Sequence, residues 1–339
     1  MTTLSKRLLI AAPFLVWLVN IILLQRKSLG FLPLDHDPNA HRHDMSVMII
    51  ASRPKSHEQY ATIWSQLECF AEKFDQVILA TDHQFKEAVF DFMKEIHKRM
   101  PEIGKKLKTE FYTNNRYDTG LWCDSLTKGK LLKLNEDHKD KTTTNKEINF
   151  DIYDSATSQY KNFFLINDSL LALEKSNELL DALISKNASL VSLNYWGNKL
   201  FSFTYWLESP ARAFSLDGIK IFANALCTLP SINHNNWWLF CPRLFLADMT
   251  DAEGVKRCIA ELTEISLVKH FPLEKVHGLY PSKDPGGKHW IRSFKYWEFL
   301  RQNMSFPVMK VKQIPHARAH NRSHEFKYCT NKMKKWQLN

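Results

Sequence analysis

The sequence predicts an α/β fold in which a mostly parallel sheet is flanked by helices and preceded by one N-terminal transmembrane helix. Apolar runs of strand length alternate with amphipathic segments of helical period, a pattern typical of parallel sheets. Hydrophobic residues make up 44% of the 339 residues and aromatic residues 12%, so a substantial core is expected. A long uncharged apolar run stands close to the N-terminus.

That apolar run covers residues 8–24, LLIAAPFLVWLVNIILL. As a helix it would span about 25 Å, slightly less than a typical hydrocarbon core. Basic pairs stand on both sides of it, so the positive-inside rule orients it only weakly. A cleaved signal peptide is the alternative, but residues 25–27 (QRK) follow where a cleavage site needs small residues. We therefore expect an uncleaved signal anchor.

This anchor predicts a single-pass type II protein of the Golgi or ER membrane, with its main domain in the lumen. Sequons at Asn187, Asn303 and Asn321 agree with that location, whereas the sequon at Asn167 ends a buried run and is not expected to carry a glycan. Six cysteines follow the membrane segment, and their even number permits disulfides without revealing the pairing. The expected organisation is a cytosolic tail at 1–7, the anchor at 8–24, a stem at 25–44 and a luminal domain at 45–339.

The first half of that domain alternates strands and helices. Residues 45–51 (MSVMIIA) form a continuous apolar run, as expected of a strand buried on both faces. The elements expected next are, in order, a helix at 58–74, a strand at 75–81, a helix at 83–99 ended by Pro101, a strand at 107–113, and a helix from the following polar turn to about Leu134.

In the second half, strand and helix patterns continue to alternate to about residue 195, and the pattern is weaker after that. Residues 135–149 are almost all polar and predict an exposed loop. The elements expected after this loop are a strand at 163–166, a helix at 174–183, a strand at 188–193, and helices at 244–250 and 255–270. The five strands and their helices predict a parallel sheet with helices on both faces.

A carboxylate directly follows a buried strand in KNFFLINDSLLA, residues 161–172. Ligands of open parallel sheets bind outside the carboxyl ends of the strands, which is where Asn167, Asp168 and Ser169 are expected. A carboxylate there can hold a divalent cation or ribose hydroxyls, and the cation can neutralise a diphosphate. The same reasoning applies to Asp118, which follows the third strand. Both aspartates could instead cap the helices that follow them.

Several common sites are absent from the sequence. It contains no glycine-rich dinucleotide motif, no P-loop, no serine-hydrolase elbow and no zinc-protease motif. The formal net charge is +10, but the basic residues are scattered, so we expect no nucleic-acid partner.

Four segments resemble blocks of the rhamnan synthesis protein F family. The first two are NNRYDTGLWCDSL (114–126), similar to a family block of the form Asn-x-Gly-x-Asp-x-Gly plus an aromatic residue, and NFFLINDSLLAL (162–173), similar to a strand ending in Asn-Asp-Ser. TYWLESPARAFS (204–215) and YWEFLRQNMSFPVMKVK (296–312) are similar to the following block and to a final Phe-Pro-x-x-Lys element. The resemblance covers about residues 45–315.

This resemblance implies a GT-A-like glycosyltransferase with a nucleotide-sugar donor. The Asn167-Asp168-Ser169 edge would take the place of the Asp-x-Asp motif, with Asp168 on the donor ribose or on Mn²⁺ or Mg²⁺. Asp118 and Gly120 would contact the nucleoside. The chain departs from the pattern at Arg116-Tyr117, where the family has a small glycine-containing step. It also has one acidic residue where GT-A enzymes often have two or three.

An inverting transferase needs a carboxylate as general base, for which Glu208 is the first candidate and Asp217 the second. Arg212 is expected to offset diphosphate charge. Three further basic candidates for that role are His316, Arg318 and His320. Glu208 could instead be a surface residue of a helix, and each of these three basic residues could belong to an exposed basic tail.

The expected function is therefore transfer of a sugar, with rhamnose one candidate, from a nucleotide-sugar donor to a glycan or polysaccharide acceptor. The alternative is a catalytically inactive, membrane-anchored binding or scaffold protein on the same fold. The reduced acidity of the motif favours this alternative.

Overall fold

The described part of the chain is one α/β unit. The structure, a computed structural model, describes residues 45–113, 117–134, 153–154, 159–197, 205–208, 210–229, 232–233, 235–241, 250–262, 266–322, 324, 326 and 329. All of them lie in the compact unit Asp44–Asn339. The expected anchor, stem and polar loop 135–149 lie outside the described residues, as does most of the expected helix 244–250. Among the residues described, no helix combines the length and apolarity that a membrane span requires.

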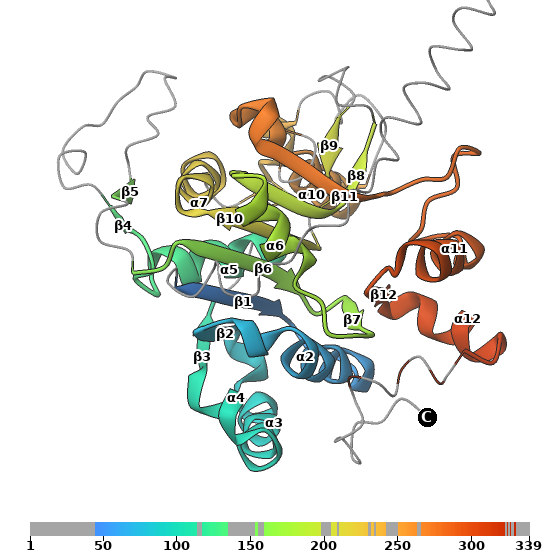
Figure 1. Cartoon of the computed structure of the whole chain (residues 1–339). Coiled ribbons are helices and arrows are strands. Elements are labelled where there is room, and N and C mark those ends of the chain that lie inside the picture. The colour runs from blue at the N-terminus through green and yellow to red at the C-terminus, as the bar shows by residue number, and fades with distance from the viewer. Residues whose placement is uncertain are drawn as a thin grey trace, which may run out of the picture. The chain divides into compact units, whose positions relative to one another are not determined.

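The central sheet has the strand order β11-β8-β10-β6-β1-β2-β3, with β9 paired to β8 (Figure 1). Strands β3, β2, β1 and β6 are parallel neighbours, and β8 and β11 are parallel to each other. Strand β10 is antiparallel to β6 and to β8. The strands are β1 (Ser46–Ser52), β2 (Gln76–Asp82), β3 (Leu107–Tyr112), β6 (Asn162–Asn167), β8 (Leu190–Trp196), β9 (Trp206–Leu207), β10 (Ala211–Ser215) and β11 (Val276–Pro281).

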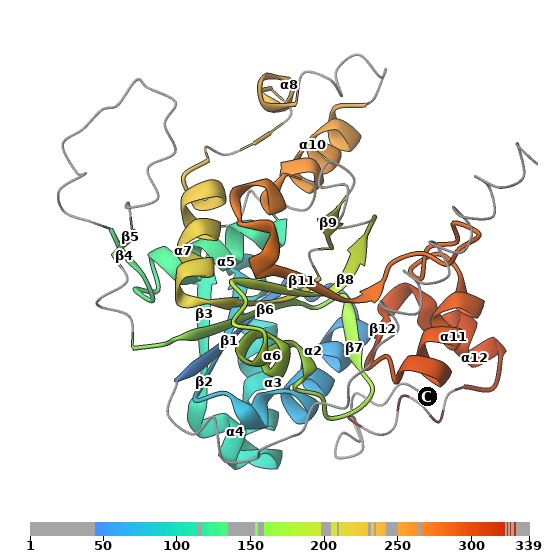
Figure 2. The same ribbon diagram turned by 45° about the horizontal axis from the view of Figure 1, so that its top comes forward.

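Two strand pairs lie outside this sheet. Strand β7 (Leu170–Ala172), which follows β6 after a two-residue turn, pairs with β12 (Val308–Lys310). Figure 2 shows these two strands together near α2. Strands β4 (Lys133–Leu134) and β5 (Tyr153–Asp154) form the other pair. The first pair matters for the site because it brings β12 from the end of the chain beside the turn after β6.

Helices cover both faces of the sheet because its strands are apolar on both sides. In β1, Met48 and Ile50 belong to one core cluster, whereas Val47 and Ile49 belong to the other. The first cluster includes residues of α2 (His57–Cys69), α3 (Lys86–Arg99), α6 (Glu178–Ser185), α11 (Phe294–Met304) and α12 (Ile314–Ala319). The second includes α5 (Tyr117–Thr127) and α7 (Leu216–Phe222). The described residues also form the α-helices α4 (Pro101–Lys106), α8 (Trp237–Phe240) and α10 (Asp251–Ala260).

The structure corrects several expected elements. Pro101 does not simply end a helix: it occupies the first turn of α4, where its missing N–H is tolerated. The helix expected to reach Leu134 ends at Thr127, and Lys133 already belongs to β4. The helix expected over 255–270 ends at Ala260. The five predicted strands correspond to β1, β2, β3, β6 and β8, and the central sheet is mostly parallel, as expected. Strands β10 and β11 were not predicted, and β10 lies antiparallel between β6 and β8.

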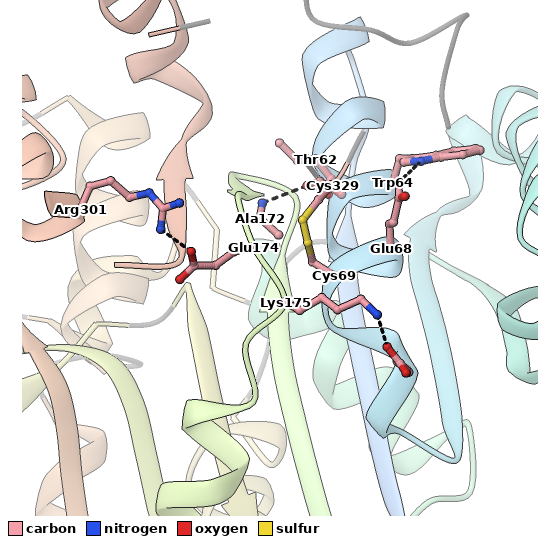
Figure 3. Close-up of a disulfide and its surroundings, with 11 residues drawn as sticks. Thr62, Trp64, Glu68, Cys69, Ala172, Glu174, Lys175, Arg301 and Cys329 are labelled. Carbon is pink, nitrogen blue, oxygen red and sulfur yellow. Dashed lines mark hydrogen bonds and ion pairs between the residues drawn. A yellow bond between two sulfur atoms is a disulfide. The ribbon is translucent and has the colours of Figure 1, made fainter. Parts of the chain in front are cut away.

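All six cysteines are paired in three disulfides. Cys123–Cys227 joins α5 to the π-helical turn after α7, and Cys241–Cys258 joins the end of α8 to α10. Cys69–Cys329 joins the end of α2 to the C-terminal segment across 260 residues. Figure 3 shows this last bond at α2, beside the segment that carries Ala172, Glu174 and Lys175. Glu174 of that segment pairs with Arg301 of α11. Two of the bridges therefore tie a helix on each face of the sheet, α2 and α5, to segments distant in the sequence.

Candidate functional site

The strand order places a topological switch point between β1 and β6. From β1 the chain builds the sheet outward through β2 to β3, and it then returns to add β6 on the other side of β1. The two strands end together, since Ala51 is paired with Asn167. Crevices that bind ligands in open α/β sheets form at such points, outside the carboxyl ends of the strands. Residues Ser52 to Arg53 and Asn167 to Ser169 surround this point.

Asp168 anchors the turn after β6 to the end of β1. Its Oδ2 accepts hydrogen bonds from Ser52 Oγ (2.9 Å), from the backbone N–H of Arg53 (2.9 Å) and from Gln59 Nε2 (3.2 Å). Its Oδ1 accepts no hydrogen bond from the described residues. Burial raises the pKa of Asp168, while these donors oppose that rise. One carboxylate oxygen is thus used structurally and the other remains available to a ligand.

The helix-cap interpretation of Asp168 was wrong, because strand β7 follows the turn and no helix begins there. Its backbone groups hold it in place on both sides. The backbone N–H donates to Ala51 O at 3.1 Å, and the carbonyl accepts from Thr62 Oγ1 at 2.7 Å. Since Thr62 lies on α2, the turn is fastened to the first helix as well as to β1.

Asn167 and Ser169 complete the turn. Asn167 Oδ1 accepts hydrogen bonds from the backbone N–H and the hydroxyl of Ser169, while its Nδ2 donates to Asp118 Oδ2 at 2.8 Å. Lys310 of β12 donates from Nζ to Ser169 Oγ at 2.6 Å. The structure therefore brings together Asn167, Asp168, Ser169 and Asp118, as the sequence predicted, and adds Lys310.

Asp118 lies in the first turn of α5. Burial and the nearby carboxylate of Asp168 raise its pKa to about 6, despite the hydrogen bond from Asn167 and the charges of Arg53 and Lys310. Two carboxylates at one strand edge repel each other unless a cation or a proton lies between them. This arrangement suits a hard divalent cation, whose preferred ligands are oxygen atoms.

Arg53 follows β1 directly and lies beside both carboxylates. Its guanidinium carbon lies 4.8 Å from the centre of the Tyr117 ring, a stacking distance. No guanidinium N–H group bonds to a described residue. Tyr117 has a φ of +54°, in the left-handed region that non-glycine residues seldom adopt. A tyrosine with a strained backbone thus stacks on an arginine whose guanidinium donors bond to none of the described residues.

Glu208 lies at the same edge of the sheet, between β9 and β10, and its side chain is enclosed. Its Oε1 is 2.6 Å from His289 Nε2, and its Oε2 accepts from Trp290 Nε1 at 2.9 Å. Burial would raise the pKa of Glu208, but these partners outweigh burial and hold the pKa below its usual value. Only 6% of the residue is exposed. The carboxylate therefore fastens the 289–290 segment to the sheet edge.

The remaining sequence candidates lie elsewhere. Arg212 is 1% exposed within β10 and donates to the carbonyls of Leu207 (2.5 Å) and Glu208 (3.0 Å). Asp217 lies in the first turn of α7, just after Ser215. Ser215 pairs with Asn162 at the start of β6, so Asp217 is near the opposite edge of the sheet from Asp168. Gly120 is buried in α5, and His316, Arg318 and His320 are exposed on or just after α12.

Sequence reasoning missed Arg53, Gln59 and Lys310. Arg53 follows a predicted strand, so the rule that singled out Asp168 could have identified it. Lys310 is the lysine of the Phe-Pro-x-x-Lys element. Among the described residues no cluster of three or more histidines, cysteines or carboxylates could hold a metal. A cation at this edge would therefore have to be held by Asp118, by Asp168 and by oxygen atoms of the molecule that binds with it.

Comparisons with known proteins add little to this geometry. No family model matches the chain, and no curated protein matches it, so the resemblance to the rhamnan synthesis protein F family stays a prediction. A solved structure of 4-diphosphocytidyl-2C-methyl-D-erythritol synthase from Anaerococcus prevotii DSM 20548 matches 78% of this chain and 97% of its own, at 8% identity and a TM-score of 0.36.

The bifunctional glycosyltransferase WbbM, in its apo structure, matches 79% of this chain at 8% identity and a TM-score of 0.36. The match spans 45% of the WbbM chain. Both scores are too low to establish a shared fold, so the function proposed next rests on the residues of this chain.

Proposed function

We propose that this chain is a glycosyltransferase of GT-A-like fold that binds a nucleotide-sugar donor at the switch point between β1 and β6. The observation that carries the proposal is the convergence of Asp118 and Asp168 at that edge. Asp168 is buried and Asp118 half-buried, and their mutual repulsion is unfavourable for stability unless a function needs it. Their location outside the carboxyl ends of parallel strands is where a nucleotide is expected.

The donor's diphosphate is the part of the substrate that this edge suits best. Sugar transfer requires that the negative charge on the departing nucleoside diphosphate be stabilised. Asp118 and Asp168 would hold Mn²⁺ or Mg²⁺ through oxygen atoms, and such a cation would neutralise that charge. Asn167 and Ser169 would supply neutral hydrogen bonds, although both also serve the turn itself. The donor could carry rhamnose, and a glycan or polysaccharide would be the acceptor.

Glu208 is a weaker candidate for the general base than the sequence suggests. A base must reach the acceptor hydroxyl and accept its proton. Both oxygens of Glu208 already face N–H groups of neighbouring side chains, and its lowered pKa weakens it as a base. Asp217 is displaced toward the opposite edge. We therefore assign no proton transfer to either residue.

A location in the secretory pathway is part of the proposal. Three disulfides with no free cysteine in the described chain fit an oxidising compartment. The sequon residues Asn187, Asn303 and Asn321 are exposed, whereas Asn167 is 5% exposed and bonded within the turn. Digestion of the purified protein with a glycosidase specific for N-glycans should lower its apparent mass if this location is right.

A catalytically inactive binding protein is the second candidate. This second candidate is favoured by the hydrogen bonds that Asp168 Oδ2 accepts within the protein. These bonds give Asp168 a structural role that needs no ligand. An inactive protein could still bind a nucleotide but would not release free sugar or transfer it. Measuring donor hydrolysis separates these two candidates.

The test is a thermal-shift panel on the full-length protein with UDP, GDP, dTDP and CMP, each with and without Mn²⁺. One nucleotide should raise the melting temperature, and Asp118→Asn and Asp168→Asn should remove that shift. Asp217→Asn is the matched control, since it removes an exposed acid near the other edge of the sheet. If no nucleotide shifts the folded wild-type protein, the proposal is wrong.

A further inference from the structure

Two cations from distant parts of the sequence meet at the carboxylate pair. Arg53 follows β1, and Lys310 ends β12, which reaches the site by pairing with β7. Lys310 donates to Ser169 Oγ, and the backbone N–H of Arg53 donates to Asp168 Oδ2. The charges of both cations act on Asp118. The site therefore combines two carboxylates and two cations, which four separate segments contribute.

The charge balance of this site indicates what it can accept. Two carboxylates and two cations cancel, so neither a free anion nor a free cation is favoured alone. A divalent cation together with the doubly charged diphosphate of a nucleotide-sugar would enter as a neutral pair. In that arrangement the carboxylates face the metal, and the protein's cations face the phosphate oxygens.

The guanidinium group of Arg53 is positioned to bind a diphosphate. Its guanidinium offers planar paired donors that match a phosphate, and none of them bonds to a described residue. Tyr117 fixes the guanidinium by stacking at 4.8 Å. Holding an arginine in place before the ligand arrives lowers the entropy lost on binding.

The backbone of Tyr117 supports a role for this contact. A φ of +54° is unfavourable for a residue with a side chain, and glycine would adopt it without strain. The ring is also 38% exposed, so burial in the core does not account for it. Strain of this kind persists where a function needs it.

We propose that Arg53 and Lys310 together bind the diphosphate of the donor, and that Tyr117 is a positioning residue for Arg53. This inference rests on the proposed glycosyltransferase function and names the residues that hold the leaving group. It assigns the diphosphate to residues from β1 and β12, whereas the sequence suggested Arg212 and the α12 region.

Calorimetric titration of the full-length protein with UDP, GDP, dTDP and CDP in Mn²⁺ tests the two cations. For the nucleotide that binds, Arg53→Met and Lys310→Met should each weaken the affinity about 10- to 100-fold, the range expected for one charge-assisted hydrogen bond. The matching nucleoside, which has no phosphate, should bind all variants alike. Lys55→Met and Lys312→Met are controls, because each removes an exposed lysine two residues away.

Arg53→Lys keeps the charge but loses the paired geometry, and an intermediate affinity is expected. If Arg53→Met fails to fold, the affinity of Arg53→Lys still tests the role of Arg53. Wild-type affinity in Arg53→Lys, Arg53→Met and Lys310→Met would overturn the inference while nucleotide binding itself stood. Failure of the wild-type protein to bind any nucleotide would overturn the proposed function instead.

Tyr117 is tested by two variants with opposite expectations. Tyr117→Phe keeps the ring and should bind the diphosphate like the wild-type protein. Tyr117→Gly should melt at a higher temperature, because strain is released, yet bind the diphosphate several-fold more weakly. Unchanged affinity in Tyr117→Gly would overturn the positioning role.

Discussion

Replacing Asp118 with asparagine should stabilise the protein at neutral pH while removing donor binding. The carboxyl group of Asp118 has its pKa raised to about 6 from an ordinary value of 3.8. At pH 7.5 the group is ionised in both the folded and unfolded states, and the folded state bears the cost of burying that charge near Asp168. Asparagine has nearly the same shape, can still accept the hydrogen bond from Asn167, and carries no charge.

The difference between 3.8 and about 6 corresponds to about 3 kcal/mol at high pH. Asp118 is only half-buried, so solvent screening reduces this figure, and losing its attraction to Arg53 and Lys310 reduces it further. We therefore expect Asp118→Asn to raise the free energy of unfolding by about 1–2 kcal/mol at pH 7.5.

The stabilisation that Asp118→Asn provides should depend on pH, and this dependence would identify the buried charge as its cause. Well below pH 3.8 the carboxyl group is protonated in both states, so the substitution should be nearly neutral. Its benefit should grow as the pH rises through 3.8 to above about 6. Urea denaturation at about pH 2.5 and at pH 7.5 measures both values, with Asp217→Asn as the control.

A destabilised Asp118→Asn protein at pH 7.5 would refute this reasoning. So would a stabilisation that is the same at both pH values, because that result would point to packing and not to charge. Donor binding gives the second readout, since the variant should lose the Mn²⁺-dependent shift even though it is more stable.

Three further predictions concern the framework of the site. Asp168→Ala should lower the free energy of unfolding by about 2–4 kcal/mol in urea denaturation, because three donors lose their shared acceptor; a neutral effect would contradict its anchoring role. Glu208→Ala should cost about 3–5 kcal/mol at pH 7, since His289 loses its partner, and the loss should shrink as the pH falls through the lowered pKa of Glu208; a pH-independent loss would argue against the ion pair. Replacing Cys123 and Cys227 together with serine should cost about 3–5 kcal/mol, because the bridge closes a loop of 104 residues; a variant that unfolds at the wild-type urea concentration would show the bridge to be dispensable.

The first half of the sheet was predictable because its strands carry plain signals. Residues 46–52 are buried throughout, so the strand reads as one apolar run between turn residues. The candidate site was predictable for the same reason. Asp168 interrupts an apolar run, which marks the carboxyl end of a buried parallel strand.

In the second half, strand β8 was predicted at 188–193, but β10 and β11 were not, because their residues do not form a strand pattern. Strand β10 contains Arg212, whose charge argues against burial until tertiary structure supplies carbonyl partners. Strand β11 contains His277, Gly278 and Pro281, which break the strand pattern. Lys310 belongs to the Phe-Pro-x-x-Lys element, but nothing in that element indicates that it lies beside Ser169. Its place at the site arises only from the pairing of β12 with β7.

The most direct test of the central claim is hydrogen–deuterium exchange on the full-length protein, with and without the nucleotide that shifts its melting temperature. Binding at the switch point predicts slower exchange in residues 52–62, 117–121 and 167–171, and no change in 215–222. Protection confined to other segments, or no protection at saturating nucleotide, would contradict a donor site between β1 and β6.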